Sequence, residues 1–134
     1  MNTRDKIVYF ALKTCCRIYK AKSRDITNNN NRQGPTIKAK RMFLYYLYNY
    51  IEIKHKDMRL YIKNLNHATS VHHVHKFRFE LDNYLEVKQN FDKFIAEMQK
   101  FNVYGAGFYE KRKELKKLLK EINIIKTITD DKRI

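Results

Sequence analysis

The chain has 134 residues, enough for one compact domain or for a core with an appended element, but too few for two large independent domains. Lys and Arg number 29 against 14 Asp and Glu, so the formal net charge of +15 favours a polyanionic partner, either nucleic acid or an anionic membrane surface. No apolar run approaches the roughly 20 residues of a membrane-spanning helix, and the first residues lack the apolar stretch of a signal peptide. We therefore expect a cytoplasmic protein that does not bind membranes.

Apolar periodicity predicts an all-α fold that begins with an N-terminal helix over residues 1–22. Cys15 and Cys16 lie in this helix, and adjacent residues cannot form a disulfide framework, so we expect them to be small apolar fillers in a reducing compartment. An Asn run followed by Gly34 and Pro35 predicts a flexible basic linker over residues 23–35.

The next segment, residues 36–81, reads as a helix-turn-helix unit. It contains one helix that ends near Glu52, a shorter helix over residues 56–63, and a third helix from His67 with Asn66 as its N-cap. Asp82 and Asn83 should interrupt the third helix. Two further amphipathic segments, separated by residues 104–107, predict a C-terminal helical hairpin over residues 84–128, followed by a tail over 129–134. The hairpin could join two copies into a homodimer.

The third helix of this unit has two different faces when it is drawn at 100° per residue. The apolar sector contains Val71, Val74, Phe77 and Leu81. Nearly opposite lie Thr69, His72 and Lys76, while His73 lies to one side and Phe79 falls unexplained on the outer side. Hydroxyl, imidazole and ammonium groups on one face are suited to the major groove of DNA, where they meet base-edge acceptors, thymine methyls and phosphates.

Residues 39–77 resemble, without a gap, the C-terminal DNA-binding domain of the bacterial replication initiator DnaA, a Trp-repressor-like helix-turn-helix. The most specific part of that family is a turn followed by Asp-His-Ser/Thr-Thr-Val-x-His, which appears here as the segment Asn-His-Ala-Thr-Ser-Val-His at residues 66–72. The resemblance implies major-groove contacts by Asn66, His67, Thr69 and His72. It also implies a minor-groove contact by Lys38, and phosphate contacts by Lys54 and Lys56 in the loop after the first helix.

The sequence also departs from the family pattern. The family's Gly-Gly-Arg is Lys63-Asn64-Leu65, its Asp is Asn66, and its first hydroxyl residue is Ala68, so the recognised DNA sequence should differ. The chain contains no G-x-x-x-x-G-K-[ST], so we expect neither an ATP site nor any other cofactor.

Charge placement independently favours a basic arm before the helix-turn-helix, because residues 1–41 carry eleven basic and two acidic side chains. The candidate DNA-binding residues are polar or basic and lie in this arm, in the first loop, in the turn or on the third helix. They are Lys38, Lys40, Arg41, Lys54, His55, Lys56, Lys63, Asn64, Asn66, His67, Thr69, Ser70, His72, His73 and Lys76.

Some of these side chains also fit other functions. His72 and His75 have the i, i+3 spacing of metal ligands, but no Cys or carboxylate accompanies them, so groove contact or solvation is favoured. The imidazoles could also strengthen DNA binding at mildly acidic pH as they gain charge. Tyrosines 45, 46, 48 and 50 should be core and groove-filling residues rather than a stacking platform for single strands. No nucleophile with a base and an orienting group is visible, so we expect neither an enzyme nor a small-molecule substrate.

The sequence therefore predicts a protein that binds double-stranded DNA. Its role would be that of a regulator or of a replication or packaging accessory, associated with a nucleoid, a virus or a mobile element such as a phage. Two alternatives remain open. One is a helical protein adaptor whose binding face is the segment 84–126, and the other is an RNA-binding protein.

Overall fold

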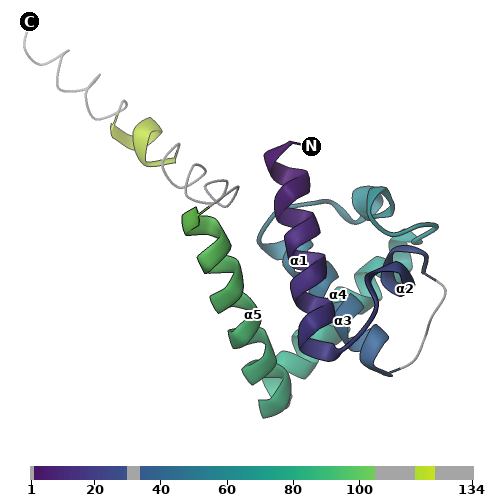
Figure 1. Cartoon of the computed structure of the whole chain (residues 1–134). Helices are drawn as coiled ribbons and strands as arrows, with labels where there is room; N and C mark the ends of the chain where they lie inside the picture. The colour runs from purple at the N-terminus through teal and green to yellow at the C-terminus, as the bar shows by residue number, and fades with distance from the viewer. Residues whose placement is uncertain (1, 30–33, 105–116, 123–134) are drawn as a thin grey trace, which may run out of the picture.

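The computed structural model describes residues 2–29, 34–104 and 117–122, and it is all-α over these residues, with no strand among them (Figure 1). The elements in chain order are α1 (Thr3–Tyr19), α2 (Ser23–Thr27), α3 (Gly34–Asn49), the 3-10 helix η1 (His55–Leu60), α4 (His67–Asn83) and α5 (Leu85–Tyr104). Residues 117–122 are helical as well. The predicted fold class is confirmed.

Helix α1 begins where the Asn2 side chain accepts a hydrogen bond from the Asp5 backbone N–H at 2.8 Å, and it ends at Lys20, which has a left-handed backbone. Its buried face packs against α3 and α5. Cys15 and Cys16 lie on this face and are not bonded to each other. Burial raises the pKa of the Cys15 thiol and raises that of Cys16 to about 11, so both remain protonated and act as apolar filler.

The segment predicted as a flexible linker differs from that prediction in its first half. Residues Ser23–Thr27 form the short helix α2, whose Ile26 is completely buried in the core. The carbonyl of Thr27 also accepts a hydrogen bond from the backbone N–H of Lys63 at 2.7 Å. The chain up to residue 29 is therefore tied to the turn before α4, and residues 30–33 lie outside the described residues.

Helices α3 and α4 pack against each other in opposite directions. Arg41, in the middle of α3, contacts Glu80 near the end of α4, and Tyr45, one turn further along α3, packs on Phe77, one turn earlier on α4. Between the two helices lies η1, a short 3-10 helix rather than the longer helix predicted over 56–63. Only Met58 of its six residues is buried, and a single packed side chain gives this segment little support for a regular α-helix.

Aromatic rings fill the centre of the core. Tyr46 is 1% exposed and its ring meets Phe94 edge to face, while Tyr45 contacts both Phe77 and Phe91. These two tyrosines are core residues, as predicted. Tyr48 and Tyr50 lie outside the core and are more than one-third exposed; Tyr48 stacks on His55, and Tyr50 contacts Tyr46 and Phe91.

Helix α5 packs its apolar face on α1 and α4. The buried residues of this face are Val87, Phe91, Phe94 and Met98. α4 ends at Asn83, close to the predicted interruption. The break at 104–107 and most of the second arm of the predicted hairpin lie outside the described residues, apart from 117–122, where Leu118, Leu119 and Ile122 are exposed. No helix in the described part of the chain has both the length and the apolar character needed to cross a membrane.

Candidate nucleic-acid interface

The N-terminus of α4 is fixed by the predicted cap. Asn64 has a positive φ of 57°, which turns the chain, and Asn66 has an extended backbone. The side-chain oxygen of Asn66 accepts a hydrogen bond from the backbone N–H of Ala68 at 2.8 Å. Because this oxygen is used within the helix, the amide NH2 of Asn66 is the group left to donate to a ligand.

The outer face of α4 is exposed along its length. The exposed candidates on this helix and its cap are Asn66, His67, Thr69, His72 and Lys76. They begin at the helix N-terminus, where the backbone N–H groups and the helix dipole favour negative charge. The structure therefore places Thr69, His72 and Lys76 on one side of the helix, and Asn66 and His67 at its N-terminus, where His67 contacts His55.

Ser70 and His73 face the protein interior, which corrects their prediction as ligand contacts. Ser70 is completely buried, and its Oγ forms a hydrogen bond with His55 Nδ1 at 2.8 Å. His73 is 7% exposed, and burial, together with the charges of Lys40 and Arg41, lowers its pKa to about 4. Both lie on the side of α4 that packs against the rest of the fold, so neither can reach DNA.

Two cations of the expected basic arm are also engaged within the protein. Lys40 is buried on α3, and its ammonium group donates to the side-chain oxygen of Asn29. Arg41 Nη1 lies 2.8 Å from Glu80 Oε1, in an ion pair whose side chains are 19% and 11% exposed. A desolvated Glu80 needs this partner, so Arg41 is not available to a phosphate. Lys40 and Arg41 are therefore structural in the described fold, contrary to their predicted role.

His55 connects the first loop to α4. Its ring stacks on Tyr48 with the centroids 4.1 Å apart and meets His67 at 5.7 Å, in addition to its hydrogen bond with Ser70. Burial and then the neighbouring His67 and His75 lower the pKa of His55. His55 thus holds η1 against the start of α4, which makes it a positioning residue more than a contact.

Exposed cations surround this junction. Lys54 and Lys56 flank His55, and Lys63 lies in the turn with the exposed Asn64. Two further exposed cations, Arg59 on η1 and Arg78 on α4, were missed because the resemblance does not assign them a role. The signal that could have found them is the charge pattern: from residue 58 to residue 79 the sequence contains no Asp and no Glu.

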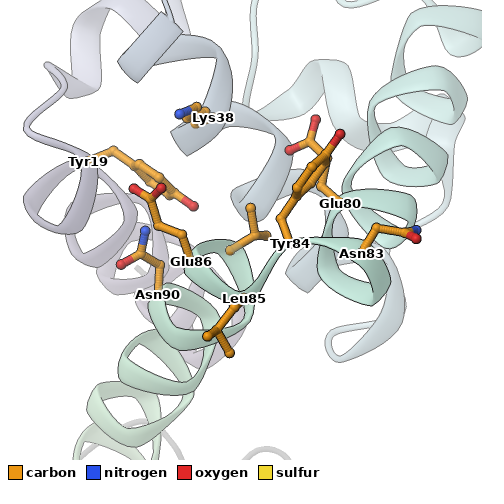
Figure 2. Close-up of a pocket in the computed structure, with 9 residues that line it drawn as sticks. Tyr19, Lys38, Glu80, Asn83, Tyr84, Leu85, Glu86 and Asn90 are labelled. Atoms are coloured by element: carbon orange, nitrogen blue, oxygen red, sulfur yellow. The ribbon is translucent and has the colours of Figure 1, made fainter.

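Lys38 lies at the other end of α4. It lines a cleft of about 520 Å³ at the junction of α1, α3, α4 and α5. In Figure 2, Glu80 and Tyr84 form one wall of the cleft, and Tyr19, Glu86 and Asn90 form the other. Residues 67 and 80 are thirteen positions apart, which is about 20 Å along the helix. The structure therefore does not bring Lys38 together with His67 and Thr69.

The described residues contain no group of three or more His, Cys, Asp or Glu side chains that could hold a metal ion. His72 and His73, whose ring centroids are 5.8 Å apart, point to opposite environments, one exposed and one buried. The arrangement is that of a polar, cationic surface on a rigid helix, which can bind an anionic ligand.

Comparisons with models of known protein families, with curated proteins and with solved structures find no match to this chain.

Proposed function

We propose that the chain binds double-stranded DNA, with α3, η1 and α4 acting as a helix-turn-helix and α4 as its recognition helix. The observation that carries this proposal is the exposed outer row Thr69, His72 and Lys76 on a helix that belongs to an acid-free stretch of 22 residues, 58–79. Residues 58–79 therefore present no carboxylate that would repel a polyanion. The nearest acidic side chain on α4, Glu80, is neutralised by Arg41.

The dimensions of α4 are suited to binding in the major groove of DNA. The major groove of B-DNA is about 12 Å wide and admits an α-helix. The distance along the axis from Asn66 to Lys76 is about 15 Å at 1.5 Å per residue, which corresponds to four or five base pairs at about 3.4 Å each. The exposed polar residues from Asn66 to Lys76 therefore cover one recognition site of ordinary length.

The loop cations provide the second part of the binding mode. Lys54 and Lys56 are exposed on either side of His55, which is itself fixed against α4 by Ser70. Phosphates beside the groove would be held by these two ammonium groups, which contribute affinity but little sequence selectivity. An A-form RNA duplex has a major groove too narrow for α4, so the geometry favours DNA over double-stranded RNA.

The biological setting of this binding remains part of the proposal: a regulator, or an accessory of replication or packaging. The resemblance of residues 39–77 to the DNA-binding domain of DnaA supports the same binding mode. The changes at Leu65, Asn66 and Ala68 lead us to propose a different target sequence.

The test is selection of preferred sites from random duplexes with the whole protein, followed by fluorescence anisotropy titrations. We expect enrichment of a defined site, and loss of that preference after Thr69→Ala with His72→Ala. Lys76→Ala should weaken binding to all duplexes and reduce the salt slope by about one unit. Lys93→Ala, an exposed lysine on α5, is the matched control and should change neither. Weak binding without enrichment, insensitive to the double substitution, would overturn the proposal.

A further inference from the structure

Phe79 is an exposed aromatic residue on the outer face of α4 that neither the core nor the polar row explains. Its side chain is 52% exposed, whereas Phe77, two positions earlier, is 1% exposed and packs against Tyr45 and Phe91. The Phe79 ring has two neighbours: the edge of Tyr84 at 6.4 Å and the ammonium group of Lys76 at 5.5 Å from its centroid. Leaving a phenyl ring in water is unfavourable, and Phe79 is the only exposed phenylalanine among those that the structure describes.

The position of Phe79 on the helix aligns it with Ala68. The two residues are eleven positions apart, and at 100° per residue they differ by about 20° in direction. Both are exposed, and the exposed His72 lies between them on nearly the same line. The outermost line of α4 therefore begins at the methyl group of Ala68, passes the imidazole of His72 and ends at the ring of Phe79, about 16 Å along the helix.

The major groove of DNA offers one apolar group that matches such a line. Thymine carries a methyl group at C5 that points into the major groove, and proteins contact it with Ala, Thr methyl or Phe side chains. Lys76 lies beside Phe79, so its ammonium group can reach a phosphate while the ring faces a base edge.

The charge around Phe79 favours DNA over a protein partner. The exposed Arg78 and Lys76 adjoin it in the acid-free stretch 58–79, and the exposed Asp82 lies one turn further along the helix, so cations outnumber acids around the ring. A purely apolar docking site for a protein would not need cations so close to its centre, whereas a groove lined by phosphates does.

We propose that Phe79 and Ala68 read thymine methyl groups at the two ends of the α4 footprint, so that the preferred DNA carries thymines four or five base pairs apart. This inference rests on the proposed function and adds a determinant of its specificity. The ligand is then a 5-methylpyrimidine-bearing duplex, and a duplex that contains uracil in place of thymine is a weaker ligand.

The test compares two duplexes of equal length, alternating d(A-T) and alternating d(A-U), which differ only in the C5-methyl group. The wild-type protein should bind the thymine duplex more tightly, by about four-fold for each methyl contact. Phe79→Ala should reduce this preference by about four-fold and leave the affinity for the uracil duplex nearly unchanged. Leu85→Ala is the control, because Leu85 is 70% exposed at the same junction but lies on α5. Circular dichroism would confirm that both variants are folded.

The outcomes separate the two proposals. If the wild-type protein binds neither duplex, the proposed function fails and this inference falls with it. If it binds both duplexes equally, or if Phe79→Ala keeps the thymine preference, DNA binding stands and the role of Phe79 is overturned. If Phe79→Ala and Leu85→Ala both change the molecular mass in solution without changing the thymine preference, the junction is a protein-docking surface and the inference is wrong.

Discussion

His73 should make the stability of the fold depend on pH. The side chain is 7% exposed, and its Nδ1 has no hydrogen-bond partner among the described residues. Lys40 and Arg41 on α3 and His72 on its own helix face it, and burial followed by these charges lowers its pKa to about 4. In the unfolded chain the pKa of a histidine is about 6.5. Between these two values the unfolded chain binds more protons than the folded protein, so the free energy of unfolding falls as pH falls.

The size of the effect follows from linkage. From pH 7 to pH 5, a histidine whose pKa moves from about 6.5 to about 4 on folding lowers the free energy of unfolding by about 2 kcal/mol. The loss should level off below pH 4, where both states are protonated. His73 remains neutral in the folded protein at pH 6, so it does not contribute to any gain in DNA affinity at that pH.

Urea unfolding followed by circular dichroism at pH 7 and pH 5 measures this effect. His73→Leu removes the titrating group while keeping an apolar side chain in the interior, and should make the pH-dependent loss about 2 kcal/mol smaller than in the wild type. His75→Gln replaces an exposed histidine on the same helix and is the control. The reasoning is refuted if His73→Leu loses as much stability between pH 7 and pH 5 as the wild-type protein.

Four further substitutions test the packing that presents the interface, each by urea or thermal unfolding. Asn66→Ala removes the cap of α4 and should cost about 1 kcal/mol; no loss would mean that the cap does not hold the helix start. Phe77→Ala should lower the free energy of unfolding by about 3–5 kcal/mol, because it leaves a cavity beside two aromatic rings. Thr69→Ala, on the outer face, should change it by less than about 0.5 kcal/mol. Similar losses in the two variants would contradict the assigned orientation of α4. Glu80→Ala leaves Arg41 without its partner and should cost about 2–3 kcal/mol; a neutral effect would show that the pair is solvated.

Local features of the recognition helix could be predicted from the sequence. The cap at Asn66 depends on residues two positions apart, and the exposure of Thr69, His72 and Lys76 follows from helical periodicity. The interior position of Ser70 could not be predicted, because it depends on a hydrogen bond to His55, fifteen residues earlier. Burial of a small polar residue on a helix requires a partner that periodicity does not identify.

The basic arm shows the same limit more strongly. Charge alone favours solvent exposure for Lys40 and Arg41, but their partners are Asn29, eleven residues before Lys40, and Glu80, thirty-nine residues after Arg41. The helix α2 was missed because five residues with one buried side chain, Ile26, show no measurable period. Tertiary contacts, rather than local preference, decide the structure of this segment.

The most direct test of the central claim is a titration of the isotope-labelled protein with its selected DNA duplex, followed by amide chemical shifts in NMR spectra. If α4 is the recognition helix, the largest shifts should fall on residues 66–76 and on the loop at 54–56, while the exposed face of α5 around Lys93 should change little. Large shifts confined to α5 or to residues 117–122, with α4 unaffected, would contradict the proposal that α4 binds DNA.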